Sequence, residues 1–272
     1  MRRSLLVCLC LTLLAAVWCP GPALAGPVLD RVVHSGVLRV GASLDNPPLT
    51  FLSRSGQPEG YEVDLAKMVA GGLGVKLSMV AMPADQLLPA LSEGKVDLVI
   101  SAVTMYPDRN RQVMLVGPYL LTGQSILTNA RLLSRLTEDF EHDQPELAIA
   151  AAKGTTSAEA VKELFPKARL VEVADQEAGL KALLDRRVDA LVADHNFCVV
   201  ATLRFRDQGL ATLPKPFSTE PLGVGFSEDA LFYNWMENFF LVLRGTGRLD
   251  GLRQKWLESP NWLAELPPDQ RL

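Results

Sequence analysis

The chain of 272 residues has a formal net charge of −4, and hydrophobic residues make up 48% of it. This length allows one large domain or two smaller ones. A mildly acidic chain without basic clusters is poorly suited to bind nucleic acid or an anionic membrane surface, because lysine and arginine carry both kinds of recognition.

The first 25 residues have the pattern of a secretory signal peptide. Two arginines precede an apolar run at residues 5–18 that is short for a membrane span, and Ala23-Leu24-Ala25 fits a small-x-small cleavage site. We expect the mature protein to begin at Gly26 and to reside in the periplasm. Cys198 is the one cysteine beyond this segment, so no internal disulfide can form. Its apolar neighbours favour a buried core thiol.

Short β-branched runs then alternate with longer amphipathic runs. The pattern predicts strands at residues 37–40, 75–80 and 96–100 and helices at residues 61–73 and 85–93. Nearly continuous apolar strands separated by helices are typical of a mostly parallel sheet that is buried on both faces. The fold class is therefore predicted as α/β.

The alternation restarts after residue 146. It predicts strands at 147–151, 170–173 and 189–192 and helices at 156–164, 177–185 and 195–206, followed by a strand at 222–226 and helices at 229–244 and 249–257.

The restart indicates two lobes with chain crossings at residues 121–125 and 214–222. We assign residues 26–121 and 222–272 to lobe 1 and residues 122–221 to lobe 2. Two crossings form a hinge with a cleft beside it. Because ligands of open α/β sheets bind at the carboxyl ends of strands, residues just after Ile100 and Val192 should line this cleft.

An ordered set of short motifs runs through the chain. It comprises Gly36-Val37-Leu38-Arg39-Val40-Gly41, Gly60-Tyr61-Glu62-Val63-Asp64-Leu65-Ala66, Gly94-Lys95-Val96-Asp97, Ser101 to Arg109, Gly154-Thr155-Thr156-Ser157 and Val188 to Asp194. In order and spacing the set resembles the extracellular solute-binding proteins of family 3, the amino-acid receptors of ABC importers. The resemblance covers Gly36 to about Leu257. It implies a type II periplasmic-binding-protein fold in a monomer that delivers a small solute to a membrane permease.

An α-amino acid presents a carboxylate and an ammonium group to its receptor. Arg109 suits the carboxylate, because a guanidinium can hold a carboxylate with two hydrogen bonds. Asp194, just after a predicted strand, suits the ammonium. The resemblance places both residues in these roles and adds the Thr104 hydroxyl to the carboxylate site. Thr155 and Thr156 begin a helix, whose free N–H groups favour an anion.

The part of the site that would select the ligand side chain departs from the family. Ala102, just beyond the predicted strand that ends at Ile100, is another candidate site residue. Ser43 and Asn46 stand where relatives often carry an acid and a stacking aromatic residue, so a basic or aromatic ligand is disfavoured. Phe51 is a candidate to replace the lost stacking, and His195 is a candidate contact for the ligand side chain. A small or polar amino acid, or a related carboxylate, fits this departure.

Two alternatives stay open at this point. An enzyme resembling cyclohexadienyl dehydratases could use the same fold, and a free receptor could deliver its ligand to a membrane sensor. The sequence has no Gly-x-Ser-x-Gly elbow, no Cys/His metal spacing and no phosphate-binding glycine loop, so we expect neither a metal nor a cofactor.

Overall fold

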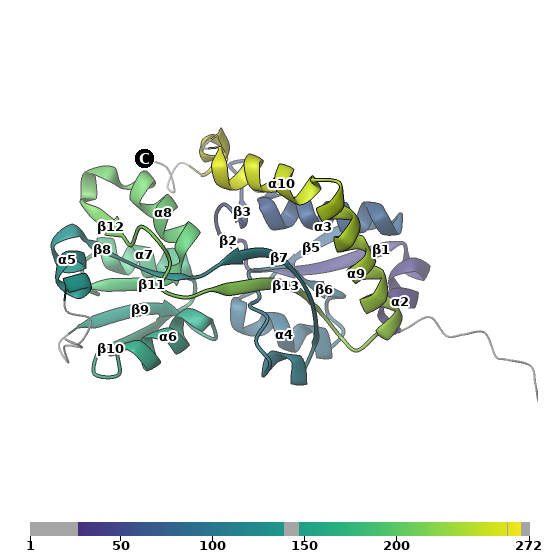
Figure 1. Cartoon of the computed structure of the whole chain (residues 1–272), viewed down its shortest axis with the longest axis horizontal. Helices are drawn as coiled ribbons and strands as arrows, with labels where there is room; N and C mark the ends of the chain where they lie inside the picture. Colours follow the sequence, from purple (N-terminus) through teal and green to yellow (C-terminus); the bar gives the residue numbers. More distant parts are fainter. Residues whose placement is uncertain (1–26, 139–146, 260, 268–272) are drawn as a thin grey trace, which may run out of the picture.

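The computed structural model describes residues 27–138, 147–259 and 261–267. The predicted signal peptide lies outside these residues. Figure 1 shows two lobes side by side, each built on its own sheet and joined by long strands that run between them. Within the described residues no helix is long and apolar enough to cross a membrane.

The first lobe contains a five-stranded sheet in the order β5-β1-β6-β13-β7. Strands β5, β1 and β6 are parallel, and β13 runs antiparallel to both of its neighbours. The strands are β1 (Val37–Ala42), β5 (Lys76–Ala81), β6 (Leu98–Val99), β7 (Met114–Thr122) and β13 (Glu220–Phe226). A small separate sheet contains β2 (Asp45–Asn46), β3 (Thr50–Leu52) and β4 (Pro58–Glu59). The helices are α2 (Pro27–Ser35), α3 (Tyr61–Leu73), α4 (Ala84–Ser92), α9 (Ala230–Gly245) and α10 (Arg248–Arg253), with a π-helical turn at Gln254–Glu258 and 3-10 turns at Arg109–Arg111 and Asn261–Glu265.

The second lobe repeats this topology in the order β10-β9-β11-β8-β12, with β8 as the antiparallel strand. Its strands are β8 (Gln124–Asn129), β9 (Ala148–Ala152), β10 (Arg169–Val173), β11 (Ala190–Asp194) and β12 (Leu210–Thr212). Its helices are α5 (Ala130–Glu138), α6 (Thr156–Leu164), α7 (Gln176–Leu184) and α8 (His195–Arg204), with a 3-10 turn at Arg206–Gln208. In each sheet four strands run in one direction and one runs against them, so both sheets are mixed, whereas the sequence predicts mostly parallel sheets.

The two lobes are connected by two crossings that lie against each other. One passes from β7 through Gly123 into β8, and the other enters β13. A Cβ atom on Gly123 would lie 1.9 Å from the carbonyl oxygen of Ser218, so only glycine fits where the crossings touch. The Gln124 backbone N–H also donates to the Ser218 hydroxyl at 2.8 Å. The residue boundaries of the lobes stay a prediction.

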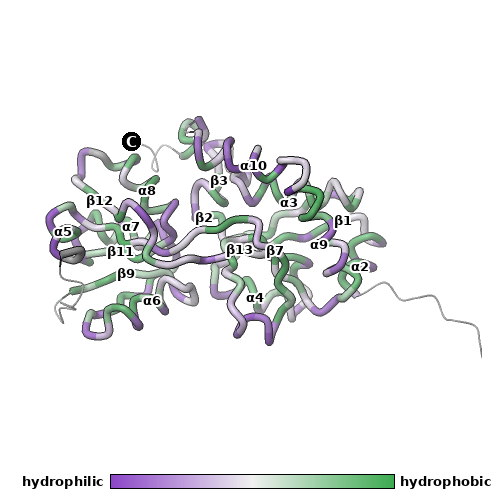
Figure 2. The backbone as a smooth tube through the Cα atoms, viewed as in Figure 1, coloured by the Kyte–Doolittle hydropathy of each residue, from purple (hydrophilic) through white to green (hydrophobic). Residues whose placement is uncertain are grey.

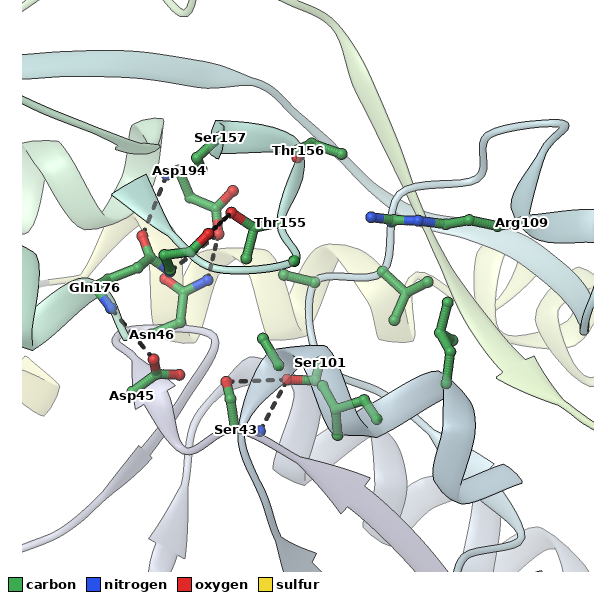
Figure 3. Close-up of a pocket in the computed structure, with 17 residues that line it drawn as sticks. Ser43, Asp45, Asn46, Ser101, Arg109, Thr155, Thr156, Ser157, Gln176 and Asp194 are labelled. Atoms are coloured by element: carbon green, nitrogen blue, oxygen red, sulfur yellow. Dashed lines mark hydrogen bonds between the residues drawn. The ribbon is translucent and has the colours of Figure 1, made fainter. Parts of the chain in front are cut away.

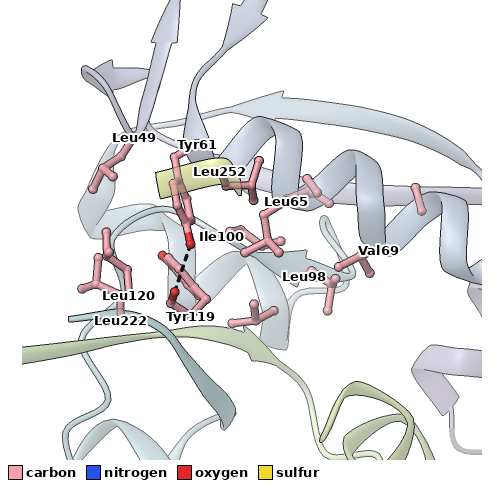
Figure 4. Packing of buried hydrophobic residues seen from close by; sticks show 14 of the residues in the cluster. Leu49, Tyr61, Leu65, Val69, Leu98, Ile100, Tyr119, Leu120, Leu222 and Leu252 are labelled. Carbon is pink, nitrogen blue, oxygen red and sulfur yellow. Dashed lines mark hydrogen bonds between the residues drawn. The ribbon is translucent and has the colours of Figure 1, made fainter. Parts of the chain in front are cut away.

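The core follows from the apolar strands. All five residues of β9 and of β11 are buried, as expected for inner strands covered on both faces. Figure 2 shows hydrophobic residues along the strands of both lobes. In the first lobe, α3 packs Leu65 and Val69 on the sheet, and the Tyr61 hydroxyl donates to the Tyr119 carbonyl at 3.0 Å (Figure 4).

The structure differs from the sequence prediction at several elements. The strand predicted at 96–100 is paired only at Leu98–Val99. The helix predicted at 249–257 is α-helical only to Arg253 and continues as a π-helical turn. Elements α2, α5, β7, β8 and β12 and the small sheet have no counterpart among the predicted elements.

Candidate ligand-binding site

A pocket lies between the lobes and draws its walls from both of them (Figure 3). The residues after β6 and at the end of β11 line it, which confirms the position predicted from the strand ends. The lining residues are Ser43, Asp45, Asn46, Ala84, Leu87, Leu88, Ser101, Ala102, Val103, Arg109, Ala152, Gly154, Thr155, Thr156, Ser157, Gln176 and Asp194.

Asp194 is the last residue of β11, and its side chain accepts hydrogen bonds from three amides. The Asn46 amide donates to Oδ2, the Gln176 amide to Oδ2 at 3.4 Å, and the Gln124 amide to Oδ1 at 3.0 Å. Burial and the negative charge of Glu220 raise the pKa of Asp194 to about 6, although the three amides oppose that rise. At neutral pH the carboxylate is therefore mostly ionised and is largely shielded from water.

Arg109 approaches the same pocket from the first lobe. It begins a 3-10 turn after β6, is half-buried, and donates from Nη1 to the Thr104 carbonyl at 3.1 Å. In Figure 3 its guanidinium points into the pocket from the side opposite Asp45. The pocket thus has a cation on one wall and the Asp194 carboxylate on another.

The first turn of α6 borders the pocket. Thr155 is the N-cap residue, but its hydroxyl donates backwards to the Ala152 carbonyl at 2.6 Å. The Thr156 hydroxyl donates to Oε2 of Glu220 at 3.0 Å. Because the first N–H groups of a helix have no partner within it, this turn presents donors suited to an anion.

Thr104 does not line the pocket. It is 1% exposed, and its hydroxyl donates to Oε2 of Glu220 at 2.7 Å. Glu220, at the start of β13, therefore receives one hydroxyl from the segment after β6 and another, that of Thr156, from α6. This buried carboxylate ties together elements of both lobes beside the crossings.

The remaining sequence-predicted residues are placed as follows. Ser43 lines the pocket and approaches Ser101, whose hydroxyl lies 3.2 Å from that of Ser43. Ala102 also lines it, in a left-handed conformation with φ of 50°. Phe51 does not: it is buried in the first lobe, with its ring centroid 6.0 Å from that of Trp256. It is therefore a core residue and does not replace the stacking lost at position 46.

His195 does not line the pocket either. The residue begins α8 and is half-buried, and its backbone N–H donates to the Gly123 carbonyl at 2.9 Å. Burial lowers the pKa of its imidazole. The position of His195 outside the pocket lining gives no support to a contact between this residue and the ligand side chain.

The sequence model of the bacterial extracellular solute-binding proteins, family 3, matches residues 38–259. The chain belongs to this family. A cyclohexadienyl dehydratase of Pseudomonas aeruginosa is 26% identical over 233 residues, which are 85% of this chain and 86% of that protein. A glutamine-binding protein of Geobacillus stearothermophilus is 25% identical over 215 residues, or 75% and 78% of the two chains.

Solved structures of similar proteins confirm the predicted two-lobed periplasmic-binding-protein fold. A putative binding component of an ABC transporter from Wolinella succinogenes, solved in complex with lysine, has a TM-score of 0.79 and 31% identity, covering 84% of this chain and 98% of its own. The family therefore includes amino-acid-binding proteins and at least one enzyme.

Several polar residues of the site were missed by sequence reasoning. Gln176 begins α7 after the end of β10, so the strand-end rule could have found it. Gln124 is different: it reaches Asp194 because β8 pairs antiparallel with β11 and places the two residues opposite each other. No local sequence signal reports that register. Asp45 lies between Ser43 and Asn46, which were predicted site residues, but no role was predicted for Asp45 itself.

Proposed function

We propose that this protein captures a polar or small α-amino acid in the periplasm and delivers it to the membrane permease of an ABC importer. The observation that carries the proposal is the presence of the Arg109 guanidinium and the buried Asp194 carboxylate in one interlobe pocket. A zwitterion has the complementary pair of charges. The protein is proposed to act as a monomer.

Arg109 is proposed to bind the α-carboxylate together with the donors of the first turn of α6. Asp194 is proposed to accept from the α-ammonium, with its remaining lone pairs held by amides. Hydrogen bonds to charged groups contribute about 1.5–3 kcal/mol each, so either residue is worth about one to two orders of magnitude in affinity.

Contacts between the lobes support capture by closure. The Asn46 amide of the first lobe donates to Asp194 of the second, and the Gln176 backbone N–H donates to Asp45 across the same cleft at 3.4 Å. A closed cleft excludes water from the ligand, which strengthens its electrostatic interactions with the pocket.

A second candidate is catalysis on the same fold. The dehydratase relative and the Asp194 carboxyl favour it, because a buried carboxyl with a pKa of about 6 could donate a proton near neutral pH. Incubation of the purified protein with prephenate or arogenate tests this candidate. Turnover of either compound would mean that the function is catalysis and not transport. A receptor that delivers its ligand to a membrane sensor would share the binding chemistry and differ only in its partner.

The binding proposal is tested by a thermal-shift screen of the mature protein, unfolded and refolded to remove retained ligand, against amino acids and small carboxylates. A ligand bound only by the native state raises the melting temperature. We expect an α-amino acid to give the largest rise. Screening hits only from another solute class would overturn the proposal.

Calorimetry of variants then tests the assigned residues. Arg109→Ala and Asp194→Ala are expected to weaken binding of the best amino acid by about tenfold to a hundredfold. Arg111→Ala is the matched control, because this arginine is exposed and does not line the pocket. Unchanged affinity in Arg109→Ala would show that this assignment is wrong.

A further inference from the structure

The short strand β2 places Asn46, which carries an unsatisfied buried acceptor, in the wall of the pocket. Asn46 is 3% exposed, and its amide nitrogen is engaged with Asp194. Its Oδ1 is buried and has no hydrogen-bond partner among the residues that the structure describes. A buried acceptor without a partner is costly, which makes a ligand donor the natural partner for this oxygen.

The neighbouring residue adds a second acceptor on the same wall. The Asp45 carboxylate lines the pocket and accepts from the Gln176 backbone N–H at 3.4 Å, a long hydrogen bond. In Figure 3, Asp45 and Asn46 lie on the side of the pocket away from Arg109, and Ser43 and Ser101 lie below them. A carboxylate can accept about four hydrogen bonds, so Asp45 has capacity to spare.

The charges of the pocket point the same way. Its lining residues include two carboxylates, Asp45 and Asp194, and a single cation, Arg109. Glu220 adds a third carboxylate just behind Thr156. If the α-carboxylate of a ligand takes Arg109, a second carboxylate on its side chain meets no cation on the described pocket wall and faces like charges.

We propose that Asp45 and Asn46 select amino acids whose side chains donate hydrogen bonds and reject those whose side chains are acidic. Among polar uncharged side chains, amides and hydroxyls have such donors. This inference rests on the proposed function, because it takes the α-carboxylate and α-ammonium as already bound by Arg109 and Asp194. It assigns to Asn46 a hydrogen bond from the ligand in place of the aromatic stacking that relatives often use there.

Near-isosteric ligand pairs test the inference directly. Calorimetry with glutamine against glutamate, and with asparagine against aspartate, compares side chains of almost equal size. In the pair with the better-bound amide, the amide is expected to bind at least about tenfold more tightly than its acid, a difference of about 1.4 kcal/mol. An acid that binds as tightly as its amide would overturn the inference while leaving the amino-acid proposal intact.

Two variants identify the residues responsible. Asp45→Asn is expected to improve binding of the acidic ligand and shrink the preference by about tenfold. Asn46→Leu is expected to weaken binding of the amide more than that of the acid. Asp108→Asn is the matched control, because it removes an exposed carboxylate that does not line the pocket. If Asp45→Asn kept its melting temperature and its preference for the amide over the acid, the assignment of Asp45 would be wrong. If no amino acid bound at all, the proposed function would be wrong instead.

Discussion

Glu62 is a buried carboxyl beneath the pocket, and its substitution by glutamine gives a calculable change in stability. The residue is fully buried in the motif that begins α3. Its Oε1 accepts from the Ala102 backbone N–H at 2.7 Å and from the Tyr119 hydroxyl. Its Oε2 has no partner among the described residues. Burial raises the pKa of Glu62 to about 7 from an ordinary value of 4.5, and the charges of Asp194 and Asp45 add to the rise.

The sign of the pH dependence follows from this rise. Between pH 4.5 and pH 7 the folded protein keeps the Glu62 proton that the unfolded chain has lost, so the free energy of unfolding falls as pH increases through this range. Because one pKa unit corresponds to about 1.4 kcal/mol, the total loss is on the order of 3 kcal/mol. Glu62→Gln removes the titration and retains a carbonyl acceptor for Ala102 and Tyr119.

Urea unfolding at pH 4.5 and pH 8 measures this effect. We expect the free energy of unfolding to fall between these two pH values by about 3 kcal/mol more in the unmodified protein than in Glu62→Gln. The contribution of Asp194, which titrates in the same direction, is present in both proteins and largely cancels. Glu163→Gln is the control, since Glu163 is exposed on α6. Equal pH dependence in all three proteins would refute the reasoning.

Three further predictions use other parts of the molecule. Gly154→Ala should weaken ligand binding by more than about tenfold, because the φ of Gly154 is 73° and a Cβ atom there would lie 2.8 Å from the Cβ of Asp85 across the cleft. The control Gly36→Ala, where φ is 66° and the space around the Cβ is open, should lower the stability of the protein without changing its affinity for the ligand. Equal losses of affinity in the two variants would count against closure. Cys198 is buried, and burial raises the pKa of its thiol. A thiol reagent should therefore modify Cys198 only in denaturant. Rapid labelling of the native protein would contradict the buried position of this residue. Burial opposes ionisation of Asp97, but hydrogen bonds from Arg39 lower its pKa. Its stabilisation should therefore be fully present above pH 3.8 and decrease as pH falls through the lowered pKa. In urea unfolding, Asp97→Asn should lower the free energy of unfolding by about 2 kcal/mol at pH 7 and by less in acid, and an equal loss in acid would contradict this reasoning.

The sequence predicted elements best where one local pattern determined them. The helices at Tyr61–Leu73 and Thr156–Leu164 were predicted to the residue, because each begins after a turn glycine and has a clear apolar period. Gly60 has a φ of 130°, and a Cβ there would lie 2.1 Å from the Leu49 carbonyl oxygen. Strand β7 was not predicted, because Gly117-Pro118 interrupts its apolar sequence pattern. In the structure, the pairing of β7 with β13 shifts register at this place.

The site could be predicted only as far as strand ends and motifs reach. Arg109 and Asp194 follow predicted strands and line the pocket. Thr104 was predicted in the carboxylate site, but its hydroxyl donates to Glu220 instead. That contact depends on where β13 returns from the second lobe. The amide network on Asp194 likewise depends on the register of β8 and on how closely the lobes approach. Such long-range geometry leaves no periodic signal in the sequence.

The central claim is that the pocket between Arg109 and Asp194 binds both charged groups of an α-amino acid. Calorimetry of the refolded protein tests it most directly, with its best amino acid compared with the N-acetyl and the α-amide derivatives of that amino acid. Each derivative removes one charge and leaves the side chain unchanged. The account predicts that each derivative binds at least about tenfold more weakly. Equal affinity for the amino acid and either derivative would contradict it.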